Sequence, residues 1–195
     1  MRIIGGALRG RRLASLGRGD PAARLRPTTD RAREALFNLL AHGIAARIGR
    51  DPVAGARVLD LFAGTGALGL EALSRGAAEA VFVERGRVAL GILRRNIADL
   101  GLADRCRVIA ADATRLGPRG AVPCDLVFLD PPWGRDLGRR ALEAARRSGW
   151  IAPGAVIAWE EEEAQEPPPG FAPLEARRWG SGWMTLLRAE AAEGT

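Results

Sequence analysis

The 195-residue chain is long enough for one α/β domain with a hydrophobic core and a small appendage, but too short for two full domains. It has no run of about 18 apolar residues that could span a bilayer, and its Arg-rich, Gly-rich start lacks the apolar region of a signal peptide, so we expect a cytoplasmic protein. The two cysteines and the single histidine lack metal-like spacing, which argues against a metal site and against a histidine-centred active site.

The positive charge is concentrated at the N-terminus. Residues 1–33 hold nine arginines and two acidic residues, a local net charge of +7, whereas residues 34–195 hold 20 arginines against 21 acidic residues. Ile3, Ile4, Leu8 and Leu13 alternate with arginines around three glycines, which is typical of a short β-hairpin with one polar face. We predict that residues 1–25 form a basic arm that binds nucleic-acid phosphates; a solvated, disordered tail is the alternative.

Helices and strands alternate along the rest of the chain. Apolar residues at helical spacing predict a helix over residues 31–46, which Thr29 or Asp30 could cap. We then predict strands over 58–62, 80–84, 107–111, 126–130 and 155–159, and helices over 69–74, 88–100 and about 136–148. Two further strands, 174–179 and 183–188, flank a Gly-Ser-Gly turn and form an antiparallel hairpin. This alternation predicts a doubly wound, mostly parallel sheet whose ligands bind beyond the carboxyl ends of its strands.

The segment DLFAGTGALG at residues 60–69 lies between the first of these strands and its helix. Gly64, Gly66 and Gly69 match the pattern G-x-G-x-x-G, and Glu84 follows at the tip of the next strand. Glycines admit a ligand close to the backbone, and a carboxylate at this tip can hold both hydroxyls of a ribose. Asp60 would repel a pyrophosphate but attract the ammonium and sulfonium of S-adenosylmethionine. A helix-capping role for Asp60 is the alternative, but it leaves the glycines and Glu84 unexplained.

Carboxylates close four successive strands of the predicted sheet. Asp112 follows the third strand, where it could accept a hydrogen bond from the exocyclic amine of an adenine while the Ala113 N–H donates to a ring nitrogen. Together with Asp60, Glu84 and Asp130 it lies at the edge where ligands bind. This set of carboxylates favours a cationic, hydroxyl-rich cofactor.

The tetrapeptide Asp130-Pro131-Pro132-Trp133 directly follows the apolar run at residues 125–129. The two prolines restrict the backbone, so the turn can aim a carboxylate and an aromatic plane at one ligand. This combination suits a flat, weakly nucleophilic amine. The alternative is a purely structural role, in which the two prolines end the strand and Trp133 packs against the core.

Several segments resemble the RsmD family, the bacterial 16S rRNA guanine-N2 methyltransferases. They are DLFAGTG at 60–66, EALSRGA at 71–77, LDPP at 129–132, and RPTT at 26–29 together with REALFN at 33–38. The resemblance runs from about residue 2 to 188. It implies a class I S-adenosylmethionine-dependent methyltransferase fold, Rossmann-like, with strand order 3-2-1-4-5-7-6 and strand 7 antiparallel. Trp133 departs from the Tyr or Phe that is usual in the family, but it preserves the aromatic plane.

The resemblance also implies the reaction and its residues. A methyl group passes from S-adenosylmethionine to the N2 amine of a guanine, which the catalytic set Asp130, Pro131, Pro132 and Trp133 holds; Trp133 stacks on the flipped-out base. We expect the cofactor-binding residues to be Asp60, Phe62, Ala63, Gly64, Thr65, Gly66, Glu84, Arg85, Asp112, Ala113 and Asp130. We expect the RNA-binding residues to be Arg2, Arg9, Arg11, Arg12, Arg26, Thr28 and Arg33, with a surface ion pair as the alternative for Arg33.

The remaining expectations concern organisation and partners. We expect a methyltransferase domain over residues 26–188, a flexible tail over 189–195, a monomer, and 16S rRNA or the assembling small ribosomal subunit as the partner, with no membrane or metal. The acidic run 160–163 reads as a solvated turn, although the resemblance suggests a further role for Glu160; Trp179 and Trp183 read as packing residues of the hairpin.

Other functions stay open at this point. The same motif could act on an adenine N6 amine or a protein glutamine amide, although Asn is more usual than Asp130 in those groups. A non-catalytic RNA-binding assembly factor is a further alternative, against which the intact Asp60, Gly64, Gly66, Glu84 and Asp130 argue. A nicotinamide oxidoreductase is excluded mainly by Asp60 and Asp130.

Overall fold

The computed structural model, which describes residues 1–15, 29–118 and 122–191, is built on one seven-stranded sheet of order β3-β2-β1-β4-β5-β7-β6. Five strands are parallel, namely β1 (Arg57–Leu61), β2 (Glu79–Glu84), β3 (Cys106–Ala110), β4 (Cys124–Leu129) and β5 (Ile151–Glu161). The hairpin strands β6 (Phe171–Trp179) and β7 (Gly182–Ala189) are antiparallel, and β7 pairs with β5. The class I fold predicted from the sequence is confirmed, including its strand order.

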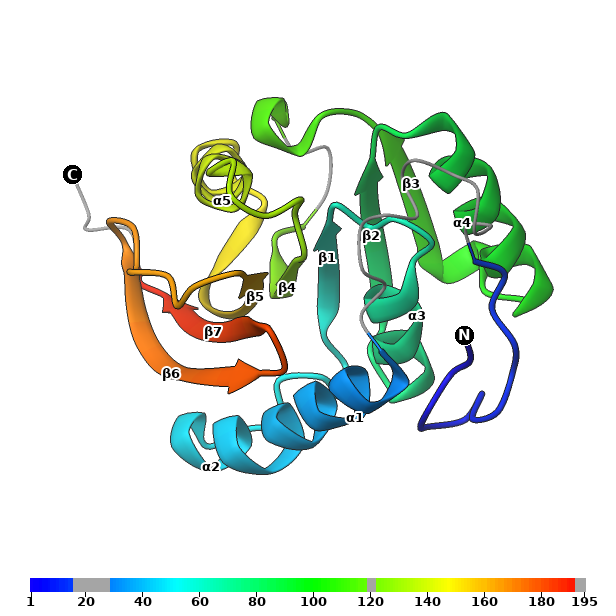
Figure 1. Cartoon of the computed structure of the whole chain (residues 1–195), viewed down its shortest axis with the longest axis horizontal. Helices are drawn as coiled ribbons and strands as arrows, with labels where there is room; N and C mark the ends of the chain where they lie inside the picture. Colours follow the sequence, from blue (N-terminus) through cyan, green and yellow to red (C-terminus); the bar gives the residue numbers. More distant parts are fainter. Residues whose placement is uncertain (16–28, 119–121, 192–195) are drawn as a thin grey trace.

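The helices also follow the predicted order (Figure 1). Thr29 caps the first helical run, because its Oγ1 accepts a hydrogen bond from Ala32 N at 3.2 Å. The run continues through one π-helical stretch, η2, and ends at Gly49 in the left-handed conformation. The helices are α1 (Asp30–Asn38), η2 (Leu39–Ile44), α2 (Ala45–Ile48), α3 (Ala67–Ser74), α4 (Arg87–Asp99) and α5 (Leu137–Arg147), with short 3-10 turns η3 (Ala103–Arg105) and η4 (Ala113–Arg115).

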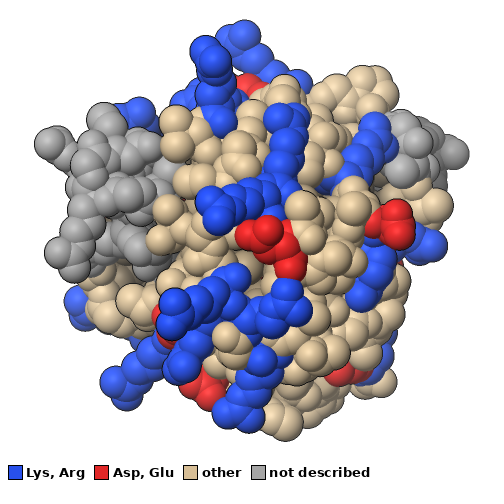
Figure 2. Space-filling view, turned by 90° about the vertical axis from the view of Figure 1, so that its right-hand side faces the viewer, with Lys and Arg blue, Asp and Glu red and all other residues tan. Residues whose placement is uncertain are grey.

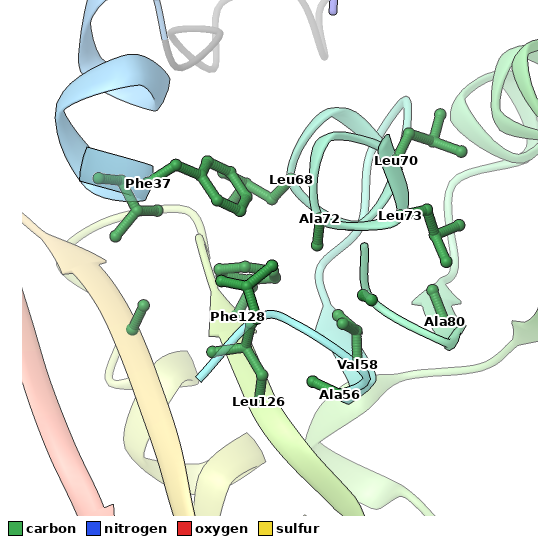
Figure 3. Close-up of a cluster of buried hydrophobic side chains, with 14 of the residues drawn as sticks. Phe37, Ala56, Val58, Leu68, Leu70, Ala72, Leu73, Ala80, Leu126 and Phe128 are labelled. Carbon is green, nitrogen blue, oxygen red and sulfur yellow. The ribbon is translucent and has the colours of Figure 1, made fainter. Parts of the chain in front are cut away.

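Helices cover both faces of the sheet, which is why the central strands are apolar on both sides (Figure 1). One core joins α1 and α3 to β1 and β4 (Figure 3). In this core the ring centroids of Phe37 in α1 and Phe128 in β4 are 5.8 Å apart. The other core packs Leu142 of α5 with Trp159 of β5. None of the helices in the described ranges is long and apolar enough to cross a membrane.

The N-terminal segment folds back on itself and packs onto α3 and α4. An antiparallel bridge pairs Arg2 with Arg12, and Ile3 N donates to Arg11 O at 2.9 Å. Ile3 and Leu13 are buried while the arginines stay exposed, as the alternation in the sequence predicts. The domain boundary expected near residue 25 lies outside the described residues, and so do residues 192–195 of the expected tail.

Candidate active site

The glycine-rich loop leaves the carboxyl end of β1 in a tight turn. Phe62, Gly64 and Gly66 have positive φ angles of 67°, 55° and 85°. A Cβ at Gly66 would lie 2.5 Å from Leu93 Cδ1, and a Cβ at Gly69 would lie 2.4 Å from Phe82 Cε1. The glycines therefore let the loop and α3 approach α4 and β2 more closely than any larger residue would.

Asp60 is a buried carboxylate under this loop, with 2% of its surface exposed. Its Oδ2 accepts a hydrogen bond from Gly69 N at 3.0 Å, so it does bind the first turn of α3. Burial raises its pKa to about 7, the Gly69 hydrogen bond opposes that rise, and the charges of Asp130 and Glu84 add to it. A cationic ligand here would reduce the electrostatic repulsion among the carboxylates of Asp60, Glu84 and Asp130.

Glu84 ties the tip of β2 to the glycine loop. Its carboxylate accepts hydrogen bonds from Gly64 N at 2.8 Å, Arg85 N at 2.8 Å and Gly86 N at 2.6 Å. A carboxylate offers about four acceptor positions, so about one remains for a ligand hydroxyl. Glu84 thus shapes the loop as well as facing the ligand edge. Holding both hydroxyls of a ribose would require it to release a backbone amide.

Asp112 and Arg85 close the edge of the site beyond β3. Asp112 Oδ1 accepts hydrogen bonds from the N–H and the hydroxyl of Thr114, and its Oδ2 pairs with Arg85 Nη1 at 3.1 Å. The Thr114 hydroxyl is the main cause that lowers the Asp112 pKa, and Arg85 contributes to the same shift. Asp112 is therefore ionised and able to accept a further hydrogen bond beside Ala113, which is buried.

The Asp130–Trp133 turn begins where β4 ends. Pro131 is buried, and Trp133 is half-buried against the turn between β6 and β7. A Cβ added to Gly182 would lie 2.7 Å from both Cη2 and Cζ2 of the Trp133 ring. The aromatic plane therefore rests on backbone that is 49 residues away in the sequence, which the local pattern around Trp133 could not reveal.

Glu161 is a site residue that the sequence analysis missed. The run 160–163 was expected to be a solvated turn, which is wrong for Glu160 and Glu161, because both belong to β5; Glu161 is 5% exposed and its charge interacts with that of Asp130. Burial raises its pKa, hydrogen bonds from Glu162 N and Gly134 N oppose the rise, and the charges of Asp130 and Glu162 add to it. The alternation of β5, which puts Ile157, Trp159 and Glu161 on one face, is the signal that could have found it.

Arg33 does not have the exposed position that the sequence analysis expected. Its side chain is 0% exposed, and Nη2 donates to Arg2 O at 2.6 Å and to Asp30 Oδ1 at 2.7 Å. Burial lowers its pKa, against the charges of Asp30 and Glu71. It is therefore neither a phosphate contact nor a surface ion pair, but a buried link between α1 and the N-terminal segment. Its helical spacing with Leu36 and Phe37 places it on the apolar face of α1.

Of the other predicted RNA-binding residues, four are exposed in the structure and two lie outside the described residues. Arg2, Arg9, Arg11 and Arg12 are exposed, and the face of the molecule toward the N-terminal segment carries many basic side chains (Figure 2). Arg11 Nη2 also donates to the carbonyl of Asp99 at the end of α4, at 2.5 Å. The predicted contacts Arg26 and Thr28 lie outside the described residues.

The strand order and the glycine loop after β1, with carboxylates at the tips of the central strands, define a class I methyltransferase. A family model described as Conserved hypothetical protein 95 matches residues 1–187, and the chain belongs to this family, the RsmD family of methyltransferases.

Several known proteins support the same assignment. The chain is 41% identical over 162 residues to Ribosomal RNA small subunit methyltransferase D of Escherichia coli K12, which covers 83% of this chain and 75% of that protein. It is 35% identical over 166 residues to the protein of the same name from Haemophilus influenzae, covering 84% and 79%. A solved Escherichia coli structure with a methyltransferase name has a TM-score of 0.80 and 38% identity, covering 98% of this chain and 99% of that one.

Proposed function

We propose that this protein transfers a methyl group from S-adenosylmethionine to the exocyclic N2 amine of a guanine in 16S rRNA. The proposal depends mainly on one observation: the glycine loop after β1 and the Asp130–Trp133 turn after β4 lie at the same edge of the sheet. The buried Asp60 lies under the glycine loop, and its charge interacts with Asp130 at the start of the Pro-Pro-Trp turn. A methyl donor held by the loop would thus lie beside the group that holds the amine. The names of the bacterial relatives indicate small-subunit rRNA as the substrate.

The residues around the loop fit S-adenosylmethionine by their chemistry. Asp60 would hold the ammonium group, since a cation is favoured beside a buried carboxylate. Glu84 would accept from a ribose hydroxyl, while Asp112 and the N–H of Ala113 would bind the adenine edge. Phe62, Ala63, Thr65 and Arg85 complete the predicted set around the loop. When bound, S-adenosylmethionine supplies an electrophilic methyl group on a sulfonium.

Asp130 and its turn would prepare the amine. The lone pair of guanine N2 is delocalised into the ring, so the planar amine attacks carbon poorly. Hydrogen bonds from the amine to the Asp130 carboxylate and the Pro131 carbonyl favour a pyramidal nitrogen and orient its lone pair. Holding the reactants in this geometry supplies an effective molarity of about 10⁵ M or more. As the new N–C bond forms, the bond between the methyl carbon and the sulfonium sulfur would break, which leaves S-adenosylhomocysteine, and one amine proton would pass to an Asp130 carboxylate oxygen and from there to water.

Trp133 and Glu161 would support this geometry from the other side. The Trp133 ring would stack on the extruded guanine, a contact that contributes about 1 to 3 kcal/mol per base in single-strand binders. Glu161 accepts a hydrogen bond from Gly134 N, directly after Trp133. It therefore holds the end of the turn that presents the ring, and Pro132 keeps the backbone between them stiff.

The N-terminal segment would bind the phosphates of the RNA. Arg2 and Arg12 are partners in an antiparallel bridge, so both side chains stand on one face and line a hollow of about 540 Å³. Like charges directly opposite each other are destabilising, and Asp30, 3.4 Å from Arg2 Nε, offsets only part of that repulsion. A phosphate between the two guanidinium groups would remove it. Arg9 and Arg11 extend the same exposed basic segment, and the partner would be 16S rRNA or the assembling small subunit.

Two measurements on an Asp130→Ala variant test the proposal. We expect the variant to lose methylation of small-subunit RNA, while S-adenosylmethionine still raises its melting temperature, because Asp60, Glu84 and Asp112 would keep their contacts with the cofactor. Glu163→Ala, which removes an exposed carboxylate after β5, is the control and keeps its activity. Retained methylation by Asp130→Ala contradicts the mechanism.

The product decides the substrate. Mass spectrometry of nucleosides from the methylated RNA should show N2-methylguanosine. N6-methyladenosine, or a methylated glutamine in protein, would instead support the alternative acceptors. If equilibrium dialysis shows no binding of S-adenosylmethionine to the wild type, the protein is an RNA-binding factor without this catalysis.

A further inference from the structure

Asn96 of α4 binds two segments that are far apart in the sequence. Its side chain is 1% exposed. Oδ1 accepts a hydrogen bond from Ala14 N at 2.8 Å, and Nδ2 donates to Ala14 O at 3.1 Å and to Thr65 O at 2.9 Å. A buried amide is destabilising unless its polar atoms are paired, and here both amide hydrogens and the oxygen have partners. The three hydrogen bonds therefore account for a polar side chain on the buried face of this helix.

The two segments that Asn96 joins are the two functional parts of the proposed enzyme. Thr65 lies between Gly64 and Gly66 in the loop that would hold the methyl donor. Ala14 lies two residues after Arg12 in the segment that would hold the RNA. The neighbouring glycine of the loop, Gly64, is held from the other side by Glu84. One amide group thus contacts both parts directly.

Other buried side chains anchor the opposite end of the N-terminal segment. Glu71 of α3 accepts hydrogen bonds from the N–H groups of Ile4 and Gly5, each at 2.8 Å. Ser74 Oγ donates to Gly5 O at 2.6 Å and accepts from Leu8 N at 2.9 Å. Ser74 is therefore similar to Asn96 in burial and in its two bonds to the segment, but its bonds lie at residues 5 and 8.

We propose that Asn96 is a positioning residue that couples RNA binding by the N-terminal segment to methyl-donor binding by the glycine loop. This inference rests on the proposed function. Ala14 takes up Oδ1 and one amide hydrogen of Asn96, which fixes the amide plane and directs the second hydrogen to the carbonyl of Thr65. When the segment leaves α4, the amide is free to turn and the loop loses a fixed hydrogen bond.

The coupling is reciprocal. RNA that binds the docked segment favours the ordered loop and so raises the affinity for the donor. By thermodynamic linkage, the donor raises the affinity for RNA by the same factor. A coupled site commits the donor loop to its binding conformation when the RNA is present.

Calorimetry on three proteins tests the coupling. The probe is S-adenosylhomocysteine, the demethylated donor, titrated with and without a saturating transcript of small-subunit rRNA. For the wild type we expect the transcript to lower the Kd by about fivefold or more, within the usual range of coupling factors. Asn96→Asp keeps the acceptor for Ala14 N but loses both N–H donors, so the Kd ratio should fall to about one. Ser74→Ala is the matched control, which weakens RNA binding but retains the ratio of the wild type.

The outcomes separate this inference from the proposed function. An undiminished ratio in Asn96→Asp, or an equal loss in Ser74→Ala, overturns the role of Asn96. A wild type that binds both ligands and methylates RNA with a ratio of one overturns the coupling alone. A wild type that binds neither ligand overturns the proposed function. If thermal melts show that Asn96→Asp does not fold, Asn96→Ala, which introduces the best helix former, takes its place.

Discussion

A single methyl group placed at Gly182 should disable the enzyme by moving Trp133. In the structure, the Gly182→Ala side chain would come within 2.7 Å of Cη2 and Cζ2 of the Trp133 ring and within 3.0 Å of the Glu161 carbonyl oxygen. Non-bonded carbons prefer separations of about 3.5 to 4.0 Å. The carbonyl belongs to β5, which is hydrogen-bonded to β7, so the ring is the part that has to retreat.

The required movement is about 1 Å, the difference between the contact at 2.7 Å and an ordinary separation. A misplacement of about 1 Å at a reacting group can lower a rate by about 10²-fold. That factor corresponds to about 2.7 kcal/mol of transition-state free energy. We therefore expect kcat/KM for RNA methylation to fall by about two orders of magnitude, while the Kd of S-adenosylhomocysteine stays near its wild-type value.

A double-mutant cycle tells displacement of Trp133 apart from general damage to the hairpin. Trp133→Phe removes the outer ring atoms that Gly182→Ala would touch, so combining the two should restore most of the activity of Trp133→Phe alone. The loss of activity in the double variant is then much smaller than the sum of the two single losses, so the interaction free energy is large. Full activity of Gly182→Ala, or additive losses in the double variant, would refute the reasoning.

Three further predictions concern burial and charge. The pKa of Asp60 is about 7 in the native state, against an ordinary 3.8. Between these two pH values the native state keeps a proton that the unfolded chain releases. The unfolding free energy therefore falls as pH rises from about 4 to 7, by up to about 4 kcal/mol. Asp60→Asn should flatten the dependence of the melting temperature on pH between 4 and 7 and abolish donor binding; an unchanged profile contradicts the assignment. Gly69→Ala should lower the unfolding free energy by about 1 to 3 kcal/mol in urea titrations, because its methyl group meets the Phe82 ring, whereas Gly91→Ala on open helix surface should raise it by about 0.5 to 1 kcal/mol. Arg12→Ala should reduce the slope of log K against log salt for RNA binding by just under one unit, and Arg33→Met, at a buried site, should leave that slope unchanged; equal slopes in both variants would disprove the distinction.

The helices, the strands and the glycine loop after β1 could be predicted from the sequence because their signals are local. Apolar runs of strand length alternate with helical spacing, and each strand found by this pattern is present in the structure with its ends shifted by a few residues. The glycines at 64 and 66 were recognisable for the same reason, since a positive φ is a property of one residue and its neighbours. The fold class therefore needed little more than periodicity and turn chemistry.

The errors occurred where a polar residue is buried by distant segments. Arg33 lies on the apolar face of α1, and the N-terminal segment that covers it is 31 residues away at its contact with Arg2 O. Glu161 lies at the end of β5, and its charge interacts with that of Asp130, which directly follows the neighbouring strand β4. In both cases charge suggested solvent exposure, but a hydrogen bond with a remote backbone group accompanies burial: Arg33 donates to Arg2 O, and Glu161 accepts from Gly134 N.

Charge distribution, strand and helix periodicity, and the two motifs after β1 and β4 are encoded within short stretches of chain, so residue types alone could predict a methyltransferase-like site and a basic arm. Three features were decided only by the tertiary structure. They are the contact of Trp133 with Gly182, the burial of Glu161, and the hydrogen bonds that join Ala14 through Asn96 to Thr65. They are contacts between segments that only the packed sheet and helices bring within a few ångströms, and no local preference of the chain specifies such distances.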